Sequence, residues 1–171
     1  MLGRPCVKSP NGDPLLLLDQ NRAHWNQLLI RRGLAALDRA EGTNKPVGTY
    51  VLQAEIAACH ARARTNEETD WARIVALYGA LARLEPSPIV ELNRAVAVSM
   101  AEGAAAGLEL VDALATEPAL KRYHMLPAVR GDLLEKLGRA IEARAEFERA
   151  AELAQNSRER ALLAARAAAV S

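Results

Sequence analysis

The sequence predicts an all-helical protein in which antiparallel helix hairpins stack side by side. The chain of 171 residues contains 35 alanines and 25 leucines but only 10 valines and 5 isoleucines. Alanine and leucine favour helices, whereas the β-branched residues that fill strands are scarce, which argues against a β-sandwich or barrel. Two tryptophans, three tyrosines and one phenylalanine are too few to fill a core, so the helices must approach closely through small residues. We expect about eight helices in this all-α stack.

The N-terminal part of the chain is predicted to hold an irregular lead-in and a first helix. Residues 1–18 combine prolines and glycines with no apolar periodicity, which indicates irregular structure. We interpret them as a lead-in from a missing N-terminal region, so that residues 19–171 form a single helical-repeat domain. The first helix is expected to begin between Asp19 and Ala23 and to run to about Arg39, because apolar residues recur there at helical spacing.

Capping residues and prolines divide the rest of the chain into seven further helices. Apolar residues recur at spacings of three and four in each segment, and Ser87-Pro88 and Asn156-Ser157 are typical helix starts. The expected helices cover residues 49–64, 69 or 70 to 84, 88–100, 104–116, 123–137, 139–155 and 158–170.

A repeat of 36 residues connects two of the predicted hairpins. One hairpin has the small and aromatic residues of a tetratricopeptide unit, whose length is roughly 34 residues: Gly131, Ala143, Phe147 and Ala150. The matching residues 36 positions earlier are Ala95, Gly107, Val111 and Leu114. We therefore predict a tetratricopeptide-like, right-handed stack with a degenerate hairpin over 49–85, hairpins over 88–116 and 123–155, and a capping helix over 158–170. An ordinary helical bundle is the alternative.

The charge balance and the apolar content exclude several classes of protein. Twenty-two lysines and arginines against 21 aspartates and glutamates leave a net charge of +1, which provides no field that would attract nucleic acid or an anionic membrane. No apolar run approaches the roughly 20 residues of a membrane span, and the start of the chain lacks the apolar region of a signal peptide. Two cysteines do not make a disulfide framework. We expect a cytoplasmic protein.

The chain has no residue pattern that indicates catalysis or a bound metal. His24, His60 and His124 lie far apart in the sequence, and no spacing typical of zinc ligands accompanies them. Cys59 and His60 are adjacent in a predicted helix, where their side chains diverge by about 100°. We therefore expect no cofactor and no enzymatic activity. The alternative, an enzyme built on the Cys59 or Arg22 region, lacks a convergent nucleophile, base and oxyanion site.

Two groups of residues are candidates for protein interaction. In the predicted hairpin register, Glu55, Asn93 and Asp132 fall on first helices, which line the concave face that such solenoids use for partners. Asn93 is equally well interpreted as a hydrogen-bonding residue in helix packing. Arg22 and Trp25, near the start of the domain, form the second candidate group.

Several stretches of the chain resemble a known family. The most specific are LLLLDQNRAHW (15–25) and SPIVELNRAVAV (87–98), and residues 52–63 and 123–156 extend the likeness. Together they resemble the C-terminal extension of a group of bacterial extracytoplasmic-function (ECF) sigma factors. In that group a tetratricopeptide-like domain follows the promoter-binding regions.

The resemblance implies a non-enzymatic part of a transcription initiation factor. Its expected partners are the sigma regions of the same protein and the RNA polymerase core, and its expected role is to modulate the sigma factor. The regions that would contact promoter DNA are not among these 171 residues, so this chain alone is not expected to recognise promoters. A free-standing tetratricopeptide adaptor protein is the alternative.

Overall fold

The structure, a computed structural model, describes residues 22, 25–41 and 48–170. The described residues form eight α-helices and one short 3-10 helix, with no strand among them, which confirms the all-α prediction. The predicted lead-in, residues 1–18, lies outside the described residues. The elements are α1 (Gln27–Glu41), α2 (Thr49–Arg62), α3 (Trp71–Leu84), α4 (Pro88–Glu102), α5 (Ala104–Ala113), η3 (Pro118–Leu120), α6 (Met125–Lys136), α7 (Ala140–Leu153) and α8 (Ser157–Ala169).

The helix starts follow the capping residues of the sequence. The Asp70 carboxylate accepts a hydrogen bond from the Arg73 amide at 2.9 Å, and the Asn156 side chain accepts one from the Arg158 amide. Such caps satisfy amide groups that have no partner within the helix. Pro88 opens α4 as predicted.

The prediction for the start of the first helix is wrong. Helix α1 begins at Gln27 rather than between residues 19 and 23. The Asn26 side-chain oxygen accepts a hydrogen bond from the Leu29 amide at 3.0 Å, so Asn26 caps the helix and Trp25 lies in a bend before it. The apolar pattern continues through Trp25, but the cap and not the pattern determines the boundary.

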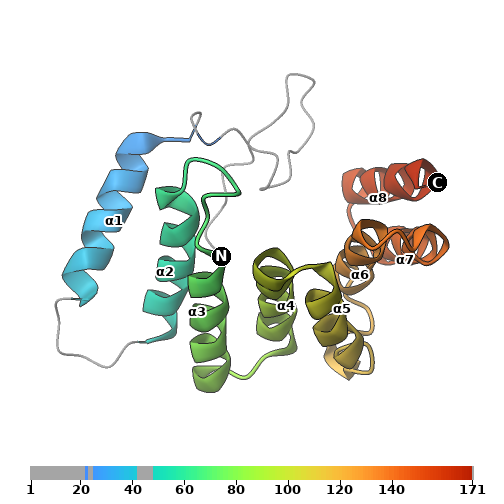
Figure 1. The fold of residues 1–171 in the computed structure, drawn as a ribbon, viewed down its shortest axis with the longest axis horizontal. Coiled ribbons are helices and arrows are strands. Elements are labelled where there is room, and N and C mark those ends of the chain that lie inside the picture. Colours follow the sequence, from blue (N-terminus) through green and yellow to red (C-terminus); the bar gives the residue numbers. More distant parts are fainter. Residues whose placement is uncertain (1–21, 23–24, 42–47, 171) are drawn as a thin grey trace.

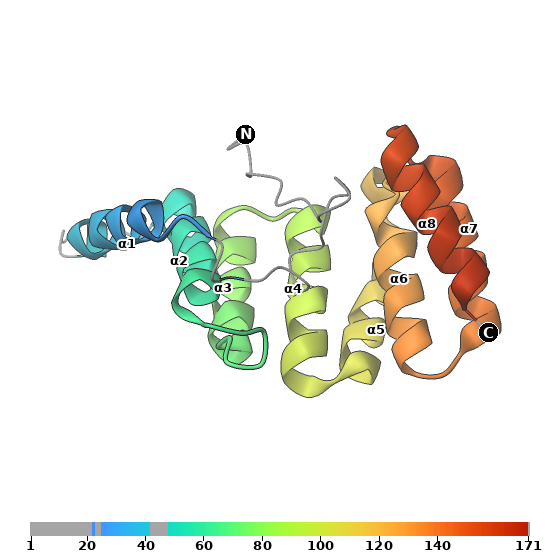
Figure 2. The ribbon, with the colours of Figure 1, turned by 90° about the horizontal axis from the view of Figure 1, so that it is seen from above.

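Each helix packs mainly against the next helix along the chain. The helices form a row from α1 at one end to α8 at the other, and their axes turn progressively along it (Figure 1). Figure 2 shows the same row from above. Helix α4 departs from nearest-neighbour packing through contacts with η3 and α6.

Two hydrophobic cores lie along this row, and α4 contributes to both. The smaller core joins residues of α2 and α3 with Ala97 of α4. The larger core joins Leu92 and Ala95 of α4 with residues of α5, η3, α6, α7 and α8. Opposite faces of α4 thus belong to different cores, and Phe147 of α7 is fully buried in the larger one.

Small residues permit the closest helix contacts, as the sequence predicts. A Cβ atom added to Gly107 of α5 would lie 2.4 Å from the Cβ of Ser99 on α4. A Cβ atom added to Gly131 of α6 would lie 2.9 Å from Cε1 of Phe147 on α7. The turn between α6 and α7 contains Gly138 with φ +73°, a conformation that favours glycine. Side chains are therefore excluded where α4 crosses α5 and where α6 crosses α7.

None of the helices in the described part of the chain is long and apolar enough to span a membrane.

Candidate interaction site

Arg22, which precedes α1 in the chain, binds the C-terminal end of α2. One guanidinium nitrogen, Nη1, lies 3.1 Å from the carbonyl oxygen of His60 and 3.3 Å from that of Ala63. It also lies 2.8 Å from the carbonyl oxygen of Thr65 and 2.9 Å from Oγ1 of Thr69. Arg22 is only 6% exposed. Four oxygen atoms therefore surround this nitrogen. Its two hydrogens are shared among these four acceptors.

The end of α2 explains why a cation binds here. The last carbonyl groups of a helix have no partner within the helix and carry the negative end of its dipole. Ala63 leaves the helix in an extended conformation, which turns the chain into the loop that leads to α3. A guanidinium group supplies charged donors for these carbonyl oxygens, and hydrogen bonds to charged groups are stronger than neutral ones.

The loop between α2 and α3, residues 63–70, is closed by hydrogen bonds of its own. The Glu68 amide donates to Oγ1 of Thr65 at 3.3 Å, and the Thr69 amide donates to the Asn66 carbonyl at 3.2 Å. The Thr69 hydroxyl donates to the Thr65 carbonyl at 3.1 Å while it also accepts from Arg22. The sequence indicated only a charged loop here, because the contacts of Arg22 span 38 to 47 positions in the chain.

Both tryptophans of the chain border this site. The Cζ atom of Arg22 lies 5.5 Å from the ring centroid of Trp25, within the range of a cation–π contact. The Nε1 atom of Trp71 donates to the Asn66 carbonyl at 3.0 Å, and the Trp71 ring meets the His60 ring edge-on at 5.2 Å. Trp25 therefore contacts the guanidinium group, and Trp71 contacts the loop and the end of α2.

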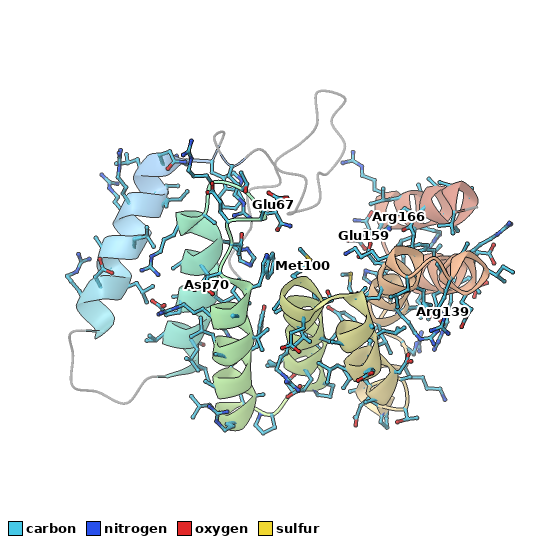
Figure 3. All side chains as sticks on the ribbon, in the orientation of Figure 1. Glu67, Asp70, Met100, Arg139, Glu159 and Arg166 are labelled. Atoms are coloured by element: carbon cyan, nitrogen blue, oxygen red, sulfur yellow. The ribbon has the colours of Figure 1, made fainter. Side chains whose placement is uncertain are left out.

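Two carboxylates of the loop contribute to the electrostatics of Arg22. Burial lowers the pKa of Arg22, and attraction from Glu67 and Glu68 acts in the opposite direction. Figure 3 shows Glu67 on the loop above α2 and α3. The guanidinium group stays charged, because arginine is not deprotonated in proteins. The two carboxylates thus favour a cation at this site.

A hollow of about 440 Å³ lies beside the Arg22 site. It is lined by Cys59, Arg62, Ala63, Glu68, Asp70 and Arg73. The Cys59 thiol is buried and free of a disulfide, and burial raises its pKa. A thiol with a raised pKa is a poor nucleophile, which argues against Cys59 as a nucleophile.

The structure separates the three residues predicted on a concave surface. Glu55 of α2 is buried, with its carboxylate 2.6 Å from Nη2 of Arg73 and 3.8 Å from Nη1 of Arg62. The expectation that Glu55 lines an open surface is therefore wrong, because the side chain turns into the contact with α3. Asn93 of α4 is exposed, which disfavours its interpretation as a helix-packing residue.

Asp132 of α6 is half-buried and takes part in a charged network with α8. Its carboxylate lies 2.9 Å from Nζ of Lys136 and 2.9 Å from Nη2 of Arg166. The same nitrogen of Arg166 lies 2.5 Å from Glu135, and its guanidinium carbon lies 4.2 Å from the Phe147 ring centroid. Figure 3 shows Arg166 and Glu159 on the C-terminal helices, far from Glu67. Asp132 thus holds α8 against α6, whatever further contact it makes.

No cluster of three or more histidine, cysteine, aspartate or glutamate side chains that could hold a metal occurs among the described residues. His60 lies at the end of α2, and Nε2 of His124 lies 3.6 Å from a Glu159 carboxylate oxygen. His24 lies outside the described residues.

Comparisons with known proteins give one informative match. The chain is 49% identical over 153 residues to a protein of Rhizobium meliloti (strain 1021) described as uncharacterized. The match covers 90% of this chain but 36% of that protein, so the chain spans about a third of its relative's length. No family model and no solved structure matches the chain.

Proposed function

We propose that this chain is the C-terminal regulatory and protein-interaction domain of an ECF-type RNA polymerase sigma factor. It acts on the promoter-binding regions of the same sigma factor and on the RNA polymerase core, and it is not an enzyme. Promoter DNA is contacted only by the promoter-binding regions, which are absent from these 171 residues.

The observation that carries the proposal is the burial of Arg22. This residue belongs to the LLLLDQNRAHW segment, one of the two most specific pieces of the resemblance. Its contacts with the end of α2 attach Arg22 to the helical domain. A domain that regulates the regions ahead of it must be connected to them mechanically, and Arg22 supplies such a connection.

The tetratricopeptide-like architecture is part of the same proposal. Three hairpins, α2–α3, α4–α5 and α6–α7, follow one another in a row (Figure 1) and are closed by α8. Close contacts at Gly107 and Gly131 fit the small positions of that repeat. A stack in which each hairpin contacts mainly its neighbours leaves an extended surface for a protein partner.

A binding titration tests the proposed function. The purified chain is added to the labelled promoter-binding regions encoded upstream in the same reading frame, and association is followed by fluorescence anisotropy. We expect measurable binding, weakened by Arg22→Ala and unchanged by Arg31→Ala, because Arg31 is an exposed arginine of α1.

A second titration uses a labelled promoter duplex. With a net charge of +1, the chain should bind duplex DNA no better than the roughly 10⁻⁴ to 10⁻⁶ M typical of non-specific binding. Sub-micromolar, sequence-selective binding of DNA by this chain alone would contradict the proposal. A reading frame without promoter-binding regions would favour the free-standing adaptor instead.

A further inference from the structure

The atoms around Arg22 form a cage of oxygens at the end of α2. Three backbone carbonyl groups and one hydroxyl group converge within 3.3 Å of a single guanidinium nitrogen. Residues 60–69 supply all four oxygens of this oxygen cage. The guanidinium group inside it belongs to Arg22, which lies 38 or more positions earlier in the chain. Cage and occupant are therefore separate pieces of the structure.

The cage contacts one end of the guanidinium group. All four oxygens lie around Nη1 of Arg22, and Nη2 is buried without a hydrogen-bond partner among the described residues. The planar, weakly hydrated shape of the guanidinium group therefore distinguishes it here from the compact, strongly hydrated lysine ammonium. The ring of Trp25 adds a contact with the guanidinium face, which arginine makes more often than lysine. Glu67 and Glu68 add negative charge nearby. The groups around Nη1 therefore accept hydrogen bonds or attract a cation, whereas Arg62 and Arg73 line the adjoining hollow.

We propose that the C-terminal end of α2 and the 63–70 loop are a binding site for an arginine side chain, filled in this structure by Arg22 of the same chain. Occupation by Arg22 adds hydrogen bonds to Thr65 and Thr69 to those that the 63–70 loop makes within itself. This inference rests on the proposed function only for its regulatory meaning, since Arg22 lies in the part of the chain nearest to the proposed sigma regions. The site itself rests on the geometry.

Hydrogen exchange of the loop amides tests the site. In Arg22→Ala the cage is empty, so the amides of Glu68 and Thr69 should exchange at least about tenfold faster than in the wild type, as loss of a hydrogen bond to a charged group implies. Arg31→Ala, which removes an exposed arginine of α1, should leave both amides unchanged. Unchanged exchange in Arg22→Ala would overturn the proposal.

Chemical rescue then tests the class of ligand. N-ethylguanidinium chloride, added to Arg22→Ala at concentrations far below those that unfold proteins, should restore the protection of Glu68 and Thr69. The effect should be saturable, with a weak affinity expected of so small a ligand, and it can also be followed by tryptophan fluorescence because Trp71 borders the loop. Ethylammonium chloride at the same ionic strength is the control. Equal rescue by both salts, or rescue by neither, would contradict a guanidinium site.

A second variant covers the case in which Arg22→Ala does not fold. Arg22→Lys keeps the charge but not the planar guanidinium group that lies against the Trp25 ring, so the loop amides should still exchange faster than in the wild type. Exchange equal to that of the wild type would show that any cation suffices and would overturn the inference. All of these measurements use this chain alone. Their outcome therefore does not depend on whether the chain binds the sigma regions.

Discussion

At the scale of single residues, the two partners of the ion pair between Glu55 and Arg73 differ in burial. The Glu55 side chain is 4% exposed, whereas the side chain of Arg73 is 51% exposed. Loss of Arg73 removes the shortest ion pair of a buried carboxylate, whereas loss of Glu55 leaves an arginine that water can solvate.

The two halves of this pair should therefore differ in their mutational cost. Arg73→Ala should lower the free energy of unfolding by about 1–3 kcal/mol, and Glu55→Met should cost less than about 1 kcal/mol because an apolar side chain suits the buried position. Urea denaturation measures the free energy of unfolding of both variants. The comparison requires that this free energy depend on urea concentration with the same slope as in the wild type. A larger cost for Glu55→Met than for Arg73→Ala would contradict this account.

Asp132 provides a pH-dependent contribution to stability. Burial opposes its ionisation, but hydrogen bonds and attraction from Lys136 and Arg166 outweigh burial and lower its pKa below the ordinary 3.8. A carboxylate whose pKa is lowered by folding stabilises the protein above its ordinary pKa, and this contribution is lost as the pH falls through the folded-state value.

In Asp132→Asn, the free energy of unfolding should therefore fall less steeply than in the wild type as the pH becomes acidic. The stability advantage of the wild type over Asp132→Asn should be full at neutral pH and should shrink as the pH falls below about 3.8. Thermal unfolding between neutral and acidic pH measures it, with Glu109→Gln, an exposed residue of α5, as the control. Parallel curves for Asp132→Asn and the wild type would argue against this role.

At the scale of elements, glycines at helix crossings set how closely the hairpins close. A Cβ atom at Gly107 would lie 2.4 Å from the Cβ and 3.0 Å from the Cα of Ser99, and 3.0 Å from the Ala95 carbonyl oxygen. Backbone atoms must move to relieve such contacts. A Cβ atom at Gly79 of α3 would meet only the flexible end of Arg83, at 3.9 Å.

The same substitution at these two helical glycines should thus have opposite effects. Gly107→Ala should destabilise the protein by about 1–3 kcal/mol through overpacking. Gly79→Ala should be neutral or stabilise it by about 0.5–1 kcal/mol, because alanine is the better helix former. Circular dichroism during thermal unfolding compares the two, and similar melting shifts of the same sign would rule out a tight crossing at Gly107.

Elements were predictable from sequence where the signals are local. Caps at Asp70 and Asn156, the proline at 88 and the glycine at 138 lie within a few residues of the boundaries they set, so propensity and spacing suffice. The start of α1 was mispredicted because Asn26 interrupts an apolar pattern that continues on both sides.

The site was less predictable than the helices. Arg22 and Trp25 were singled out by the sequence, but the oxygen cage depends on contacts across 38 to 47 positions, which no local pattern encodes. Glu55 was placed on the correct helix but on the wrong side of it, because its burial depends on Arg73 of the next helix.

At the scale of the whole molecule, the two hydrophobic cores divide the chain into two units. Ile74 is 1% exposed in the core shared by α2, α3 and α4, and Phe147 is fully buried in the core that extends from α4 to α8. Among the described helices, only α4 has buried residues in both cores. In a stack with nearest-neighbour contacts, stability is the sum of local terms and adjacent units can open separately.

A core mutation in one unit should therefore leave the other protected. Ile74→Ala and Phe147→Ala should each cost about 2–5 kcal/mol locally. By hydrogen exchange, Ile74→Ala should deprotect α2 and α3 while α6 and α7 keep wild-type rates, and Phe147→Ala should do the reverse. Helix α4 should respond to both variants, because its two faces belong to different cores. Equal loss of protection in every helix for either variant would mean that the stack unfolds as one cooperative unit, contrary to the division at α4.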